Sequence, residues 1–122
     1  MILKESLLKV ADNSGARIVK CIQPIGSKVG REGGFLIVSV KKARPGKKVQ
    51  KGRVYKALII QCRKGFPRPF GHTVSFRSNR VVLLKKSDKE VLPLGTRISK
   101  TLSFELRRLG FLKLLLISPG QL

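Results

Sequence analysis

The sequence contains few of the residues that catalytic and metal-binding sites require. It has two cysteines, one histidine and six acidic residues in 122 positions. Cys21 and Cys62 lie far apart and outside any Cys-X-X-Cys motif, so neither a disulfide framework nor a zinc site is predicted, and a reducing compartment fits best. His72 stands in a loop of prolines and glycines, where a lone histidine is more often a solvent or phosphate contact than a general base. Asp88 and Glu90 are the closest acidic pair and fall in a polar loop, so we predict no enzyme, no metal and no cofactor.

Long apolar runs are also missing. Runs such as Leu58–Ile60 and Leu114–Ile117 fall far short of the roughly 20 residues that a membrane-spanning helix needs. Residues 1–6 have neither the apolar core of a signal peptide nor the amphipathic Arg/Ser-rich stretch of a transit peptide. The glycine-rich segment 30–34 matches neither a Walker loop nor a dinucleotide fingerprint. We therefore expect no membrane partner, no small-molecule substrate, and a protein that is made where it works.

What the chain has in excess is positive charge. Twenty-seven Lys and Arg residues against six acids give a formal net charge of +21, and every charged residue from Gly33 through Ser87 is basic. An ordinary solvated surface mixes the two signs, whereas a run of one sign neutralises phosphates and releases their counterions. A polyanion is therefore the predicted partner.

Short β-branched segments separated by glycine, proline and charge predict a mainly β protein of one domain, residues 1–122. Strands are expected over Ser6–Ala11, Arg17–Gln23, Phe35–Val40, Val54–Arg63, Thr73–Arg77 and Val81–Leu84. Lys41–Arg53, with its turn at Pro45-Gly46, is predicted to form a projecting ribbon with a basic tip. Five or six short strands favour a small barrel, because closure removes exposed sheet edges.

The C-terminal third has a different pattern. Leucines recur at helical spacing over Thr101–Leu109, with Thr101 as the expected cap and Gly110 as the expected stop, so one short helix is predicted there. Phe111–Ser118 is expected to be either a last strand or a buried segment.

Two loops carry further predictions. Residues 12–15 indicate a tight turn in which Gly15 adopts a positive φ or is closely approached, so that Gly15→Val costs about 1 kcal/mol or more. Asp12 is expected to bond to nearby backbone amides or to Arg17. In the loop Arg63–His72, basic and aromatic residues alternate, so Phe66 or Phe70 either stacks on bases or plugs the mouth of the barrel.

Three blocks of the chain, in order, resemble the universal L-fourteen family of large-subunit ribosomal proteins. The first is Val10–Arg17 followed by Cys21-Ile22. The second runs from Ala57–Ile60 through Phe70-Gly71, Phe76 and Asn79 to Val82-Leu83, and the third comprises Gly95–Ile98 and Glu105–Arg107. The resemblance covers essentially the whole chain.

The resemblance implies a five-stranded β-barrel with a basic β-ribbon and a C-terminal loop carrying one or two short helices. It implies a protein that binds large-subunit rRNA, packs beside neighbouring large-subunit proteins, and bridges to small-subunit rRNA on a surface also bound by a ribosome-silencing factor. Transferred by position, that surface falls on Thr96, Arg97 and Lys113. Without the resemblance, Gly95–Arg97 would indicate only a turn with one exposed arginine.

The chain departs from the family pattern in one direction. Phe35, Lys42, Arg53 and Phe70 stand where the family usually has an acid, which accounts for part of the net charge. Such a drift fits a protein encoded and used inside an organelle. We therefore expect a mitochondrial ribosome ahead of the bacterial cytoplasm.

The sequence as a whole thus predicts a structural constituent of the large ribosomal subunit. The alternative is a free-standing basic barrel that binds single-stranded nucleic acid, but such a module needs aromatic side chains on its strands, and here they lie mainly in loops and near strand ends. The predicted rRNA contacts are Asn13, Arg17, Lys41, Lys42, Arg44, Lys47, Lys48, Lys51, Arg53, Arg63, Lys64, Arg68 and Arg80.

Overall fold

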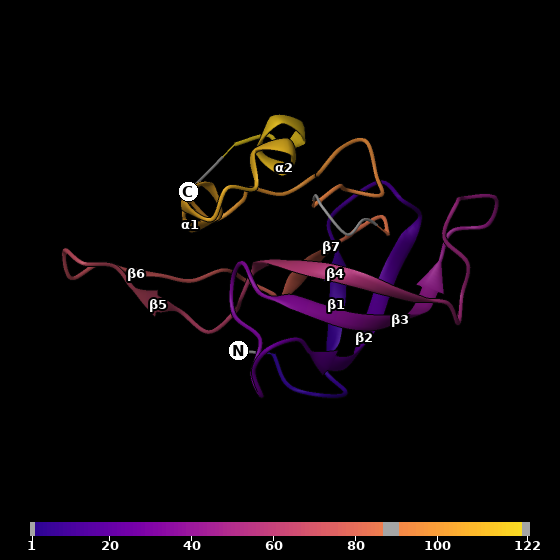
Figure 1. Ribbon diagram of the computed structural model, residues 1–122, viewed down its shortest axis with the longest axis horizontal. Coiled ribbons are helices and arrows are strands. Elements are labelled where there is room, and N and C mark those ends of the chain that lie inside the picture. The colour runs from indigo at the N-terminus through magenta and orange to yellow at the C-terminus, as the bar shows by residue number, and fades with distance from the viewer. Residues whose placement is uncertain (1, 87–90, 121–122) are drawn as a thin grey trace.

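The computed structural model describes residues 2–86 and 91–120 and is dominated by β-strands (Figure 1). In chain order the elements are β1 (Leu7–Val10), β2 (Ala16–Pro24), β3 (Phe35–Ala43), β4 (Val54–Gln61), β5 (Phe66–Pro67), β6 (Thr73–Val74), β7 (Arg80–Leu83), α1 (Glu105–Arg108) and α2 (Leu112–Ile117). No helix among these residues is long and apolar enough to cross a membrane. Asp88 and Glu90, predicted to lie in a polar loop, are outside the described residues.

Five of the strands close into a barrel, as the sequence predicts. The order is β1-β2-β3-β4-β7, with antiparallel pairs throughout except where β7 meets β1 in parallel and closes the ring. Strand alternation sends one set of side chains inward, so Leu8, Val19, Val38 and Leu83 meet in a fully buried core. Closure leaves the barrel itself without an open edge.

The part of β4 from Ala57 onward and residues 81–83 of β7 are buried on both faces. Ala57, Ile59, Val81 and Leu83 face the barrel interior, while Leu58, Ile60 and Val82 form a second core with Leu102, Leu106 and Leu114. The helices α1 and α2 lie together over this outer face in Figure 1. The sequence here is therefore continuously apolar rather than alternating, because water is excluded from both sides of the sheet.

The C-terminal segment is helical, so of the two alternatives for Phe111–Ser118, a last strand or a buried segment, the strand is wrong. Residues 112–117 form α2, in which Leu114 is buried and Leu116 is exposed. The segment is mostly leucine, which favours a helix over a strand, and one leucine face is enough to bury it against the barrel. The helix that the leucine spacing does predict is shorter than expected: α1 begins after Phe104 rather than at Thr101, and Gly110, with φ +85°, follows its end as expected.

The segment Lys41–Arg53, predicted as a basic ribbon, contains the end of β3 and the loop of the β3–β4 hairpin. Residues 44–53 form an exposed loop at one end of the barrel, apart from Val49, which is buried in the core. The backbone N–H of Gly52 donates to the carbonyl of Val40 at 2.9 Å across this hairpin. A second, longer ribbon, the β5–β6 pair, projects at the opposite end of the molecule in Figure 1, and in it Phe66 is the register partner of Val74. Its first strand lies inside Arg63–His72, which the sequence predicts wrongly as loop throughout. A single apolar residue in a basic segment is a weak signal, so the sequence does not predict that Val49 is buried.

The two cysteines are buried and free. Burial raises the pKa of the Cys62 thiol to about 12, and it also raises the pKa of Cys21. Buried thiols of this kind are inert packing residues. They belong to the barrel core rather than to a redox centre.

Candidate nucleic-acid interface

The turn between β1 and β2 is docked against the loop that follows β3. Gly15 has φ +111°, and a Cβ placed on it would collide with the side chain of Lys47. The backbone N–H of Arg44 donates to the carbonyl of Gly15 at 2.8 Å. Positive φ and close approach, which the sequence leaves as alternatives, therefore occur together at Gly15.

The carboxylate of Asp12 stabilises this turn by accepting hydrogen bonds. Its Oδ1 accepts from the backbone N–H and the hydroxyl of Ser14 at 3.1 and 2.5 Å, and its Oδ2 accepts from the backbone N–H of Leu83 at 3.2 Å. Burial raises the pKa of Asp12, although these hydrogen bonds act in the opposite direction. The predicted local bonding to backbone amides is confirmed, whereas the carboxylate bonds Ser14 and Leu83 rather than Arg17.

Asn13 hydrogen-bonds the turn to the loop at residues 96–97, which is distant in the sequence. Its Oδ1 accepts from the backbone N–H groups of Thr96 and Arg97 at 2.8 and 3.1 Å, and its Nδ2 donates to the Thr96 hydroxyl at 2.8 Å. The sequence predicts Asn13 only as an rRNA contact and misses this structural role. No sequence signal connects positions 13 and 96, because barrel closure brings them together.

Above the turn lies a groove of about 580 Å³, here called the basic groove. Its lining includes six cationic side chains from separate parts of the chain: Lys9, Arg17, Arg44, Lys47, Arg80 and Arg97. Asp12 is the acid in the lining, and it is already hydrogen-bonded. The structure thus brings together five of the predicted rRNA contacts: Asn13, Arg17, Arg44, Lys47 and Arg80. It adds Lys9 of β1, which the sequence analysis misses.

The basic groove places like charges side by side. Lys9 on β1 and Arg80 on β7 are direct register partners across the parallel pair. Two neighbouring cations repel each other unless an anion lies between them. Arg97 joins them from the loop before Ile98, which is bridged to Asp12. The groove is therefore built to receive negative charge.

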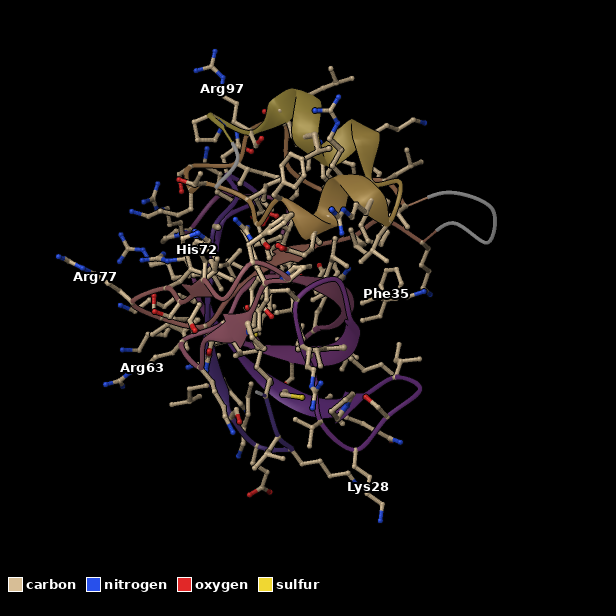
Figure 2. The ribbon with its side chains drawn as sticks, turned by 90° about the vertical axis from the view of Figure 1, so that its left-hand side faces the viewer. Lys28, Phe35, Arg63, His72, Arg77 and Arg97 are labelled. Atoms are coloured by element: carbon tan, nitrogen blue, oxygen red, sulfur yellow. The ribbon has the colours of Figure 1, made fainter. Side chains whose placement is uncertain are left out.

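The remaining predicted contacts form two outlying groups. Lys41, Lys42, Lys48, Lys51 and Arg53 are exposed along the end of β3 and the β3–β4 loop. Arg63 and Lys64 are exposed at the base of the β5–β6 ribbon. Figure 2 shows Arg63 and Arg77 pointing outward on the same side of the molecule, with Lys28 far from them.

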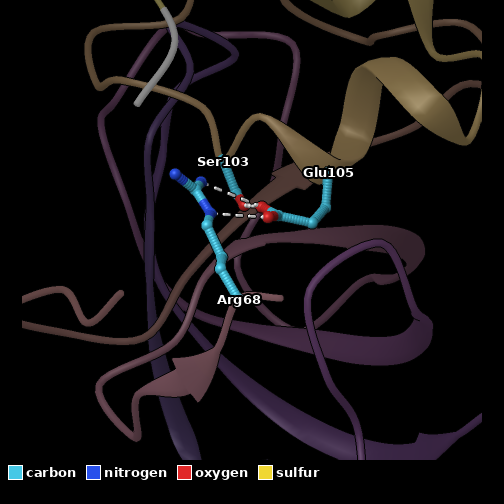
Figure 3. A network of polar contacts seen from close by, with 3 residues as sticks. All are labelled: Arg68, Ser103 and Glu105. Atoms are coloured by element: carbon cyan, nitrogen blue, oxygen red, sulfur yellow. Dashed lines mark hydrogen bonds and ion pairs between the residues drawn. The ribbon is translucent and has the colours of Figure 1, made fainter. Parts of the chain in front are cut away.

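Arg68, also a predicted rRNA contact, ties the ribbon to α1 (Figure 3). Its Nε and Nη2 donate to Glu105 Oε1 and Oε2 at 2.8 and 3.3 Å, and the Ser103 hydroxyl donates to the same carboxylate. Burial by itself would raise the pKa of Glu105, but the hydrogen bonds from Arg68 and Ser103 outweigh it and hold that pKa below its usual value. The ribbon and the C-terminal helices are thereby linked.

This link predicts an acid-sensitive contribution to stability. Because the folded-state pKa of Glu105 is lowered, its stabilisation is complete above the pKa of the unfolded chain, near 4.5, and is lost as pH falls through the folded value. We expect Glu105→Gln to lower the free energy of unfolding by about 1 kcal/mol at pH 7 and by progressively less as the pH falls below 4.5. Chemical unfolding over a pH series measures the difference, with Glu5→Gln as the exposed control; an equal loss at every pH would contradict it.

The two aromatic residues of the ribbon differ in their surroundings. Phe66 is half-buried, and the Arg68 guanidinium carbon lies 6.0 Å from its ring centre. Phe70 is 90 % exposed. Neither ring belongs to the core clusters, so the alternative in which they plug the barrel is wrong.

The predicted bridge residues are exposed near the C-terminal helices. Thr96 and Arg97 follow Gly95, and Lys113 is on α2. The two segments are connected where the backbone N–H of Ile98 donates to the carbonyl of Ile117 at 3.2 Å. Figure 2 shows Arg97 pointing away from the body of the molecule.

A closed five-stranded barrel, a groove lined by cations and a projecting ribbon define a small basic β-barrel protein. Among the residues that the structure describes, no three His, Cys, Asp or Glu side chains gather in a way that could hold a metal ion. The family model described as Ribosomal protein L14p/L23e matches residues 1–122, and the chain belongs to this family. Its members are structural proteins of the large ribosomal subunit.

Proposed function

We propose that this protein binds large-subunit rRNA through the basic groove and the exposed cations of the β3–β4 loop. The observation that carries the proposal is the convergence of six cationic side chains on one groove beside a hydrogen-bonded turn. Phosphate contacts of this kind fix the position and orientation of a protein on RNA and carry little sequence information. The role is therefore structural: the barrel holds neighbouring rRNA strands in place.

The fold supports this role by fixing the groove in advance. Asp12 and Asn13 bond the turn to β7 and to the 96–97 loop, so the backbone beneath the cations is already ordered before RNA arrives. Because the backbone that carries the cationic side chains is already ordered, less conformational entropy is lost when RNA binds. Binding of rRNA would also relieve the repulsion within a chain of net charge +21.

The alternative function, a free-standing single-strand-binding barrel, makes a different prediction in a density gradient. The native protein is expected to sediment with large ribosomal subunits at moderate salt and to leave them only at high salt, since its contacts are mainly ionic. The family membership favours this outcome. A protein found at the top of the gradient at moderate salt would instead support the free-standing module.

We further propose that Thr96, Arg97 and Lys113 face the small subunit and bridge to its rRNA, on a surface that a ribosome-silencing factor would share. Arg97→Ala is expected to leave incorporation into large subunits nearly intact, because five other cations line the groove. Subunit joining at limiting Mg²⁺ should weaken severalfold, since a charge at an interface rim affects association most. Paired gradients measure both, and loss of the variant from large subunits with normal joining would place Arg97 on the rRNA-binding surface alone.

The compartment is inferred from charge. We place the protein in a mitochondrial ribosome ahead of a bacterial one, since Phe35, Lys42, Arg53 and Phe70 replace acids of the family pattern. Fractionation of the source cells, followed by detection of the protein in organellar or cytoplasmic ribosomes, decides between them.

A further inference from the structure

The tip of the β5–β6 ribbon exposes an aromatic ring where hairpin chemistry favours a polar side chain. The loop Pro69–Gly71 is closed by hydrogen bonds from the Arg68 N–H to the His72 carbonyl at 2.7 Å and from the Gly71 N–H to the Arg68 carbonyl at 3.1 Å. Gly71 has φ +82°, as expected for the last residue of a three-residue hairpin loop. Phe70 occupies a position where asparagine, aspartate or serine would suit the turn better, and its ring is 90 % exposed.

The position of this ring is fixed by the structure around it. Pro67 and Pro69 restrict the backbone on either side of Arg68, and the Arg68 guanidinium is bonded twice to Glu105 on α1. Phe66 pairs with Val74 across the ribbon. The tip is thus a braced projection rather than a loose loop, so little conformational entropy is lost when its ring binds a partner.

The charges along the ribbon indicate the chemistry of that partner. Arg63, Lys64 and Arg77 are exposed at its base, and every charged residue from Gly33 through Ser87 is basic. An apolar protein pocket that received Phe70 would have to accommodate these cations without phosphates to neutralise them. Aromatic rings set among cations are instead the arrangement by which proteins stack on unpaired bases.

We propose that Phe70 stacks on an unpaired base of large-subunit rRNA, with the cations at the base of the ribbon on the flanking phosphates. This inference rests on the proposed function and adds to it a second contact, separate from the basic groove. Phe66 does not share the role, because it is half-buried beside Arg68. The β5–β6 ribbon therefore recognises an unstacked nucleotide by stacking on the face of its base.

The experiment uses a fluorescent replacement. The chain has no tryptophan, so Phe70→Trp introduces a single indole at the tip. With a transcript of the large-subunit rRNA as the probe, we expect wild-type affinity, strong quenching of the indole emission and protection of the indole from acrylamide. Leu116→Trp, at another highly exposed apolar position on α2, is the matched control and should keep its emission. Phe70→Leu retains an apolar side chain without a ring and should bind about tenfold more weakly.

Three results would overturn the proposal. The indole of the Phe70→Trp variant could remain as accessible to acrylamide in the rRNA complex as in the free protein, which would leave the tip in solvent. The same indole could be protected only in complete subunits and not on naked rRNA, which would assign the ring to a protein pocket. Finally, a wild-type protein that fails to bind the transcript at all would overturn the proposed function as well, and this outcome is distinguished from the other two by the missing complex.

Discussion

Replacing Gly15 with valine is expected to lower the free energy of unfolding by about 3 kcal/mol or more, a large part of the stability of a small domain. Two costs combine at this position. The backbone has φ +111°, which side-chain-bearing residues rarely adopt, and the new Cβ would collide with the Cβ of Lys47. Since Lys47 belongs to the loop fixed by the buried Val49, the loop cannot retreat without disturbing the core.

Gly46→Val is the matched control for this prediction. Gly46 also has a positive φ, +76°, but a Cβ placed on it would meet nothing within 4 Å. It should therefore cost only the backbone strain, about 1 to 2 kcal/mol. Urea unfolding of both variants, followed by circular dichroism at a salt concentration that screens the +21 charge, gives the difference. Equal losses would show that Lys47 does not crowd Gly15.

The second large effect concerns the basic groove. Changing Arg17, Arg44 and Arg80 together to glutamine removes three of its six cations and is expected to weaken rRNA binding about a hundredfold near 0.15 M salt. The plot of log affinity against log salt should become shallower by roughly 2 to 3 units, at 0.7 to 0.9 per lost phosphate contact. Glutamine keeps part of the aliphatic stem, so the packing of the half-buried Arg80 is disturbed as little as possible.

A charge-matched control separates a specific groove from general attraction. Lys4, Lys28 and Arg108 are exposed and lie outside the groove, and their triple change to glutamine lowers the net charge by the same amount. We expect this variant to retain most of the salt slope. If the two triple variants lost equal slope, the charge of the whole protein rather than the groove would govern rRNA binding.

The predictions for Gly15 and for Lys41–Arg53 show how much of the structure local sequence patterns can determine. An unusual conformation is expected at Gly15 because Asp, Asn, Ser and Gly cluster there, and its positive φ is confirmed. The projecting ribbon is expected at Lys41–Arg53 because that segment has the strongest turn and charge signals. What the sequence does not predict there is the burial of Val49, because only the packed barrel shows that the core has a place for it.

The same limit applies to the site. The excess of basic residues predicts a polyanion, but the charge run alone does not separate Arg44 and Lys47, which line the groove, from Lys41 and Lys48, which do not. Arg68 has the charge expected of an RNA contact, yet its guanidinium bonds Glu105 on α1. Its partner stands dozens of positions away in the chain, where no local pattern points to it.

Alternation, residue type and net charge act locally or additively. The order of amino acids is therefore enough to predict the five strands of the barrel, the barrel class, the sign of the partner's charge and an unusual environment for Gly15, but it misses the short strand β5. The packed barrel is needed to establish which cations share a groove, that Asn13 holds Thr96 and Arg97, that residues 112–117 are helical, and that Phe70 stands at the tip of a braced ribbon. These features depend on contacts between distant segments, and such contacts are fixed when β7 meets β1 and the ring closes.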